Sequence, residues 1–492
     1  MLILPQWAIA NERTLEAESS VTTEHTVTID GKRVPYTAIA GTQPVWDEHA
    51  KPIAALFYTY YQRSDIKDNR ERPLLISFNG GPGSGSVWMH IAYTGPKTLR
   101  IDDEGYPVQP YGVVENSSSV LDVADIVFVN PVNTAYSRII ETDEEKTNDE
   151  DESDDAKRFF GVNADIKYLA EWLNTFVTRY NRWRSPKYLI GESYGTTRVA
   201  GLALELQNNQ WMYLNGVVLV SPTDIGIERD GPVKIANRLP YFTAVAWYHN
   251  ALAQELQQRD LEELLPEVED YAINTLIPAL AMGGYLDAGT REQVATQMAR
   301  YSGLSKQSIL QNNLDVTTAF FWKELLRDKH LTVGRLDSRY VGIDRRDVGS
   351  GPDYNAELTS WLHSFTPAIN YYLREELNYR TDVKYNMFGD VTPWDSNNNQ
   401  TGENLRQAMA QNPYLKVMVQ SGYFDGATNY FDAKYTLWQL DPSGVMRDRM
   451  RFKAYRSGHM MYLRAADLKT ANQDIRDFIE WSTPSAGQPA KY

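Results

Sequence analysis

Short apolar segments that alternate with amphipathic helical segments predict an α/β fold, with a mostly parallel sheet covered by helices on both faces. Three observations carry this prediction: the strand-like runs are short and mainly apolar, helical periodicity lies between them, and a long helix-rich stretch interrupts the alternation. The strand-like runs lie at residues 54–61, 73–78, 125–129, 187–190, 215–220, 414–420 and 451–455.

The first element is a β-hairpin. Residues 25–36 alternate polar and β-branched side chains around Asp30-Gly31, a dipeptide typical of two-residue hairpin turns. Helices are expected at residues 165–183, where apolar side chains recur at helical spacing, and at 196–207 and 468–481.

The alternation of strand-like and helical segments stops after Ser221-Pro222. Residues 225–400 are mainly helix-like, polar and aromatic, with helical segments such as 251–265 and 291–301. We therefore expect an N-terminal extension and hairpin over 1–49, an α/β core over 50–224 and 401–486, and a helical cap insertion over 225–400.

Composition excludes several functions. The chain of 492 residues carries 64 acidic and 49 basic side chains, and its net charge of −15 disfavours nucleic acid and anionic membranes as partners. The absence of cysteine excludes disulfides, a thiol nucleophile and thiolate metal ligands. No apolar run reaches the ~18–20 residues of a membrane span. We expect no metal and no cofactor, and the sequence does not predict an oligomeric state.

Two further segments bear on location and ion binding. Ala8-Ile9-Ala10 resembles a signal cleavage site, although no basic region precedes it, so export to the periplasm or medium is expected, with the cytoplasm as the alternative. Residues 141–155 hold ten acidic side chains and one lysine, which is typical of a solvated loop. A calcium loop is the alternative, but the ordered ligand spacing with a central glycine is missing.

The strongest local motif is Gly191-Glu-Ser193-Tyr-Gly195, which fits the G-x-S-x-G nucleophile elbow. An apolar strand precedes it and an amphipathic helix follows it, as the elbow requires. A serine hydroxyl becomes nucleophilic only when a base takes its proton. The motif therefore predicts the α/β-hydrolase fold, with a catalytic acid and then a histidine further along the chain.

His459 is the expected base, because it alone among the seven histidines lies beyond the last strands, in a glycine-marked loop. The acid should follow the preceding core strand, where Asp425 stands in Ser-Gly-Tyr-Phe-Asp. Asp432 and Asp441 are rivals that lie further along, in the next helix or loop.

An acyl-transfer site also needs backbone N–H groups that face the developing oxyanion. One should come from Tyr194, directly after the nucleophile. The other should come from residues 79–83 (NGGPG), a glycine loop after an early strand, unless this segment is a plain tight turn.

Together, NGGPG, GESYG, the aspartate in GYFDG and the late GHM resemble the serine carboxypeptidases over nearly the whole chain, and GESYGTTR, GYFDGAT and GHMMYL are most similar to the bacterial branch. The resemblance implies a Ser193–Asp425–His459 triad. It also implies an oxyanion hole from the backbones of Gly81 and Tyr194, and a terminal-carboxylate site formed by Asn79, Gly80 and Glu192.

A glutamate can bind a substrate carboxylate only if one of the two is protonated, so Glu192 predicts a preference for acidic pH. In the family a second acidic residue partners this glutamate, and here that position is Tyr93. The leading hypothesis is a carboxypeptidase acting on peptides. An esterase, amidase or acyltransferase on the same triad is the alternative. A non-catalytic binding protein would be expected to lack part of the triad or the glycine loop, and none is missing.

Overall fold

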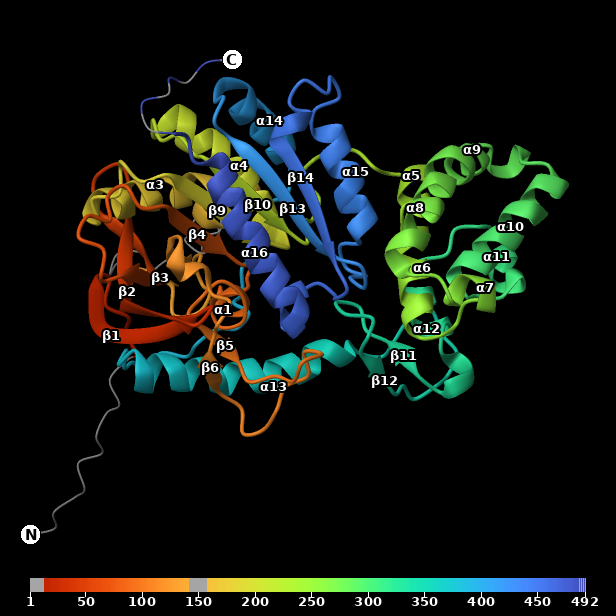
Figure 1. Ribbon diagram of the computed structural model, residues 1–492, viewed down its shortest axis with the longest axis horizontal. Coiled ribbons are helices and arrows are strands. Elements are labelled where there is room, and N and C mark those ends of the chain that lie inside the picture. The colour runs from red at the N-terminus through yellow and green to blue at the C-terminus, as the bar shows by residue number, and fades with distance from the viewer. Residues whose placement is uncertain (1–12, 141–156, 486, 488, 490, 492) are drawn as a thin grey trace, which may run out of the picture.

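The computed structural model describes residues 13–140, 157–485, 487, 489 and 491, and its centre is a ten-stranded sheet (Figure 1). The strands follow the order β1-β2-β3-β7-β4-β9-β10-β13-β14, and β8 pairs with β3. Their bounds are β1 Ser19–Ile29, β2 Lys32–Trp46, β3 Pro52–Arg63, β4 Leu74–Phe78, β7 Asp125–Val129, β8 Arg138–Ile139, β9 Lys187–Glu192, β10 Gly216–Val220, β13 Lys416–Gly422 and β14 Met450–Tyr455. The expected signal cleavage site and the acidic run at 141–155 lie outside the described residues.

The six strands from β7 to β14 run parallel, and β1, β2 and β3 extend the sheet in antiparallel fashion. At the hairpin, Ile29 pairs with Lys32, and the two turn residues Asp30 and Gly31 have φ angles of 46° and 78°. Both angles lie in the left-handed region that this tight turn requires. The predicted mostly parallel sheet is confirmed.

Helices cover both faces of the sheet because its central strands are buried on both sides. Along β10, for example, Val217 and Leu219 face one hydrophobic cluster, and Val218 and Val220 face the other. The first cluster includes α3 Val162–Arg179, α4 Tyr194–Asn209, α14 Thr401–Gln411 and α15 Tyr430–Leu440; the second includes α1 Val87–His90, α13 Ala356–Tyr371 and α16 Ala465–Ser482.

Between β10 and β13, a set of helices forms a third hydrophobic cluster beside the sheet, drawn in green in Figure 1. These helices are α5 Pro232–Ala236, α6 Arg238–Tyr248, α7 Gln254–Gln257, α8 Leu261–Tyr271, α9 Ile277–Ala281, α10 Ala288–Ser302, α11 Lys306–Gln311 and α12 Thr318–Glu324. The single helix expected at 251–265 is instead two, because Asp260 caps α8 by accepting a hydrogen bond from the Glu262 N–H at 3.0 Å.

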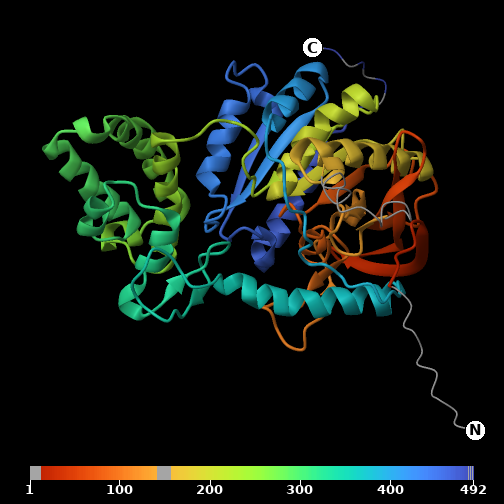
Figure 2. The ribbon, with the colours of Figure 1, turned by 180° about the vertical axis from the view of Figure 1, so that it is seen from behind.

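After α12 the chain returns to the sheet. A short strand pair, β11 Thr332–Val333 with β12 Val341–Gly342, follows α12, and a second pair is formed by β5 Lys97–Leu99 and β6 Val113–Glu115. Helix α13 then runs beneath the sheet (Figure 2), where Phe365 packs on Trp88 with ring centroids 4.6 Å apart. This helix thus joins the core of the sheet although it lies within residues 225–400. The domain boundaries at 225 and 400 stay a prediction.

Candidate active site

The candidate residues gather where parallel strands end. Asn79 follows β4, Glu192 ends β9, Asp425 lies just beyond β13, and His459 follows β14. The carboxyl ends of parallel strands meet at one edge of a sheet, which is where ligands bind in open α/β folds. A cavity of about 340 Å³ opens there, and its lining includes Asn79, Gly80, Gly81, Glu192, Ser193, Tyr194 and His459.

Ser193 stands on a sharp turn between β9 and α4, with φ 57° and ψ −126°. A non-glycine residue at such angles stores strain, of the order of 1–3 kcal/mol, which the surrounding structure must hold. The flanking glycines make the turn possible, since a Cβ at Gly191 would lie 2.1 Å from the Gly195 carbonyl oxygen. The serine side chain is therefore presented at the start of α4, beside the free N–H groups of the first helical turn.

His459 is held by a carboxylate. Its Nδ1 lies 2.7 Å from Oδ2 of Asp425, whose other oxygen accepts hydrogen bonds from the N–H groups of Ala427 and Thr428 at 2.8 and 3.0 Å. Asp425 is fully buried behind the histidine. Burial alone would lower the pKa of His459, but the charge and hydrogen bond of Asp425 outweigh it, so the pKa of His459 is raised.

The two rival acids have other partners. Asp432, in the first turn of α15, accepts hydrogen bonds from the side-chain amides of Asn237 and Asn429 at 3.0 and 2.5 Å. Asp441 follows α15 and accepts hydrogen bonds from the Ser443 hydroxyl and the Met446 N–H, each at 2.6 Å. Neither carboxylate is hydrogen-bonded to His459.

The glycine loop packs directly on the elbow. A Cβ at Gly80 would lie 2.5 Å from the Tyr194 nitrogen and 2.8 Å from the Ser193 Cβ, so only glycine fits. Gly81 has φ 111°, a conformation that other residues rarely adopt. The backbones of Gly80, Gly81 and Tyr194 thus meet beside the serine, where an oxyanion could be bound.

Sequence reasoning missed the residue that holds this loop. The Arg198 guanidinium, from α4, donates to the carbonyls of Asn79 at 2.7 Å and Pro82 at 2.6 Å. It also pairs with Asp165 of α3 at 2.6 Å, and both side chains are 1% exposed. A signal was available, since Arg198 lies among apolar positions of an amphipathic helix, where a buried charge needs a partner.

Glu192 is a buried carboxyl beside the serine, and 3% of its surface is exposed. Its two oxygens accept hydrogen bonds from Asn79 Nδ2, at 3.1 Å, and from the hydroxyl of Tyr462. Burial, only partly offset by His459 and by these hydrogen bonds, raises the pKa of Glu192 to about 7. Near neutral pH this group can therefore exist in both protonation states.

Tyr93, at the position of the family's second acid, does not reach Glu192. Its hydroxyl donates to Gln420 Oε1 at 2.6 Å, while its ring stacks on Tyr462 with centroids 4.6 Å apart. The hydroxyl that meets Glu192 belongs to Tyr462, which sequence reasoning missed. The position of Tyr462, three residues after His459, was the feature of the sequence that could have indicated this contact.

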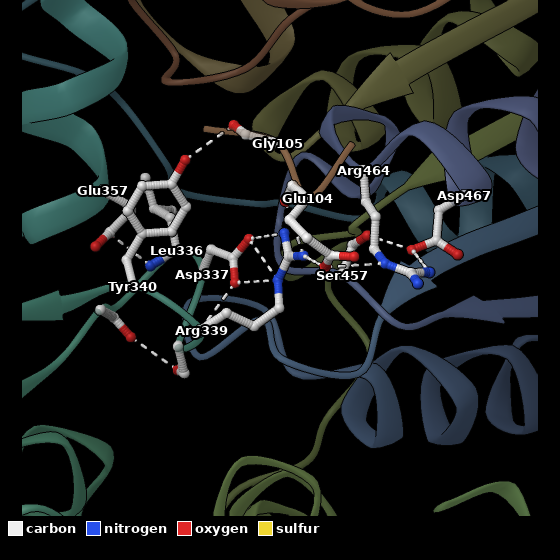
Figure 3. A network of polar contacts seen from close by, with 12 residues as sticks. Glu104, Gly105, Leu336, Asp337, Arg339, Tyr340, Glu357, Ser457, Arg464 and Asp467 are labelled. Atoms are coloured by element: carbon white, nitrogen blue, oxygen red, sulfur yellow. Dashed lines mark hydrogen bonds and ion pairs between the residues drawn. The ribbon is translucent and has the colours of Figure 1, made fainter. Parts of the chain in front are cut away.

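A segment between β11 and β12, Gly334 to Tyr340, supports the acid and histidine loops from outside. The Arg335 carbonyl accepts a hydrogen bond from the Gly426 N–H at 3.0 Å, and the Leu336 carbonyl accepts one from the His459 N–H at 2.6 Å. Figure 3 shows how the segment is anchored: Arg339 pairs with Asp337 at 2.6 Å and donates to the Glu104 carbonyl at 3.0 Å. Nothing in the sequence pattern pointed to these contacts.

Within residues 13–140 and 157–485, no three acidic, histidine or cysteine side chains gather in a way that could hold a metal ion. In the same part of the chain, no helix is both long enough and apolar enough to cross a bilayer.

The sheet order, the strand-to-helix elbow and the position of the cavity define an α/β-hydrolase. Among solved structures, a prohormone-processing carboxypeptidase from Saccharomyces cerevisiae, Kex1(delta)p, aligns with a TM-score of 0.53 over 92% of this chain and 93% of its own. The two sequences are 14% identical, so this likeness concerns the fold alone.

The sequence model of the serine carboxypeptidase family matches residues 45–461, and the chain belongs to this family. Serine carboxypeptidase-like 9 of Arabidopsis thaliana is 26% identical over 211 residues, which are 41% of this chain and 43% of that protein. The retinoid-inducible serine carboxypeptidase of Rattus norvegicus is 29% identical over 167 residues, 33% of this chain and 31% of its own. The chain thus matches less than half the length of these curated relatives. The resemblance inferred from the motifs is confirmed at the level of the family.

Proposed function

We propose that this protein is a serine carboxypeptidase that releases C-terminal residues from peptides. One observation carries the proposal: a single cavity contains Ser193, the imidazole of His459 backed by Asp425, and the buried Asn79–Glu192 pair. The serine and histidine supply the chemistry of acyl transfer, and the amide–carboxyl pair supplies a site for a terminal carboxylate.

In this mechanism His459 takes the proton of the Ser193 hydroxyl while the oxygen attacks the scissile carbonyl carbon. The N–H groups of Gly81 and Tyr194 stabilise the negative oxygen that develops. The C–N bond then breaks, His459 gives its proton to the leaving amine, and an acyl-enzyme remains. His459 then takes a proton from water, whose oxygen attacks the ester carbon. The bond between this carbon and Ser193 Oγ breaks, the shortened peptide leaves with a new terminal carboxyl, and His459 returns the proton to Ser193. Asp425 keeps the imidazole in the required tautomer throughout.

The terminal carboxylate is bound by Asn79, the Gly80 backbone N–H and a protonated Glu192. Two carboxylates cannot both ionise at contact, so this site operates while Glu192 holds a proton. Since the pKa of Glu192 is raised to about 7, binding of a free terminal carboxylate extends from acidic pH to near neutrality and weakens above it.

The test is mass spectrometry of a mixed peptide pool incubated with the protein at acidic and neutral pH. The expected result is a ladder of C-terminal truncations that the Ser193→Ala variant does not produce. Internal cleavage, or no cleavage of peptides with free C-termini, would contradict the proposal.

A second candidate, an esterase, amidase or acyltransferase, is favoured by one observation: the hydroxyl of Tyr93 faces Gln420, and among the residues that the structure describes Glu192 is the only carboxyl that lines the cavity. Peptides with amidated C-termini and small acyl esters distinguish the two candidates. Equal turnover of free-acid and amidated peptides would favour this second function.

A further inference from the structure

Arg335 differs from Glu192 and His459 at the candidate active site because its charged group has no polar partner among the described residues. It lies on the wall of the cavity that contains Ser193 and His459, and its side chain is exposed. Among the residues that the structure describes, its guanidinium has no hydrogen-bond or ion-pair partner. Two other ionisable groups of the lining, Glu192 and His459, have hydrogen-bond partners.

The backbone that carries Arg335 is held on both sides. Its carbonyl accepts the hydrogen bond from Gly426, and the following N–H, of Leu336, donates to the Glu357 carboxylate at 2.7 Å. Before it, the Gly334 N–H donates to the Tyr340 carbonyl at 2.9 Å. An unpaired cation on a fixed base loses less freedom when it binds a ligand.

Arg339 provides the contrast within the same segment. Its guanidinium is 2% exposed and fully occupied by Asp337 and the Glu104 carbonyl, as Figure 3 shows. Arg339 is therefore structural. Four residues earlier the same residue type is left without a partner and faces the cavity, which is the state expected of a ligand-binding arginine.

The surroundings of Arg335 define where its ligand would lie. Its carbonyl contacts the loop of Asp425 beyond β13, and the carbonyl of the next residue, Leu336, contacts His459 beyond β14. The charge of Arg335 acts to lower the pKa of His459. The proposed terminal-carboxylate site lies at the ends of β4 and β9 instead. The rest of the cavity wall is largely apolar and includes Trp88, Leu336, Leu358, Trp361, Phe388 and Met460.

We propose that Arg335 binds the side-chain carboxylate of an acidic substrate residue next to the scissile bond, and so gives the enzyme a preference for Asp or Glu there. This inference rests on the proposed function. A guanidinium offers a planar pair of N–H donors that matches a carboxylate, whereas the terminal carboxylate has its own site at Asn79 and Glu192.

The test compares matched peptides with Glu or Gln, and Asp or Asn, on either side of the scissile bond. Wild type should prefer the acid by about tenfold in kcat/KM at one of the two positions, the size expected of one charge-assisted pair at a solvated rim. The Arg335→Met variant keeps an unbranched apolar stem but removes the guanidinium, and its ratio should fall to about one. Arg335→Glu should reverse the preference towards Lys.

The matched control is Arg345→Met, because Arg345 is an exposed arginine shortly after β12 that does not line the cavity. It should leave the acid preference unchanged. The proposal would be overturned if the ratio of kcat/KM for Glu over Gln, and for Asp over Asn, were the same in wild type and Arg335→Met at both positions. It would also be overturned if Arg335→Met changed only the preference for a free over an amidated C-terminus, since the arginine would then bind the terminal carboxylate.

A binding measurement separates this proposal from the proposed function. In a Ser193→Ala background, N-acetyl dipeptides with Glu or Gln side chains are titrated while the intrinsic tryptophan fluorescence is followed, to which Trp88 and Trp361 in the cavity wall contribute. Binding that favours Glu and loses this preference in Arg335→Met would support the arginine site even if wild type cleaves no peptide. If wild type cleaves peptides but Arg335→Met leaves the binding preference for Glu over Gln unchanged, the proposed function is retained and the arginine site is refuted.

Discussion

At the scale of single residues, we expect the tautomer of His459 to be set by Asp425. Asp425 Oδ2 lies 2.7 Å from His459 Nδ1, and in the proposed mechanism it accepts the Nδ1 proton and leaves Nε2 to act as the base. Asparagine at position 425 would keep an oxygen for the N–H groups of Ala427 and Thr428 but would present an amide donor to the ring. The geometry of the loop would survive while the tautomer would change.

We therefore predict that Asp425→Asn lowers kcat by about 10⁴-fold, the loss that the same change causes in a serine-protease triad. Steady-state kinetics gives the value, and far-UV circular dichroism checks that the fold is kept. Asp432→Asn is the control and should change kcat only slightly, because Asp432 binds the amides of Asn237 and Asn429. If Asp432→Asn lost most of its kcat while Asp425→Asn kept it, the catalytic acid would be misassigned.

The pKa of Glu192 leads to a second prediction at this scale. Burial raises this pKa to about 7, so the carboxyl is protonated below that value and ionised above it. The KM for a peptide with a free C-terminus should rise as the pH passes upward through about 7, and the KM for the matching amide should stay flatter. At low pH kcat should fall for both substrates, because His459, whose pKa is raised, becomes protonated.

Glu192→Gln separates these two effects. Glutamine donates a hydrogen bond without ionising, so the rise in KM for the free acid should largely disappear, while the loss of kcat at low pH remains. The measurement is a pH series with paired acid and amide substrates. If wild type has the same KM profile for both, the enzyme has no carboxylate site that depends on Glu192.

At the scale of secondary structure, two helices and a loop share one buried ion pair. Arg198 on α4 joins Asp165 on α3 to the loop after β4, through the carbonyls of Asn79 and Pro82. Removing one partner of such a pair leaves a buried charge without compensation, which typically costs about 3–5 kcal/mol of stability.

We predict that Arg198→Met lowers the free energy of unfolding by about this amount and also lowers kcat, because the glycine loop loses its anchor. The double variant Asp165→Asn/Arg198→Met removes both charges and should regain part of the stability without regaining kcat. Urea denaturation and steady-state kinetics give the two quantities. A double variant with restored kcat would show that the arginine does not position the loop.

At the scale of the whole molecule, two arginines connect the inserted region to the hydrolase core in different environments. Arg339 and Asp337 are 2% and 1% exposed, and Arg339 reaches the Glu104 carbonyl of the core. Arg456 follows β14 and pairs with Asp260 and Glu262 at the start of α8, where the carboxylates are exposed. The first connection is protected from solvent, and the second is screened by water and salt.

We predict that Arg339→Met strongly lowers the melting temperature and increases hydrogen exchange in residues 334–340. Catalysis should fall too, because the Leu336 carbonyl that holds the His459 N–H belongs to this segment. Arg456→Met, the matched control, should have a far smaller effect on both. Equal losses in the two variants would contradict the structural role assigned to the buried pair.

The sequence by itself determined most strands of the sheet and where the candidate site residues lie along the chain. The run 125–129 coincides with β7, and the helix expected at 468–481 lies within α16. Such signals are local, since the alternation of apolar side chains along a strand or helix is set by backbone geometry alone. The elbow motif and chain order likewise directed attention to Ser193, Asp425 and His459, whose catalytic roles stay predictions.

Only the tertiary structure decided which side chains meet. Tyr462 rather than Tyr93 contacts Glu192, Arg198 holds the glycine loop, and the segment with Arg335 and Leu336 supports the acid and histidine loops. Each contact joins residues that are distant in the sequence, and side-chain direction chooses between them: the Tyr93 hydroxyl turns to Gln420. Periodicity reports which face of an element is buried, but the partner on that face depends on how whole elements pack.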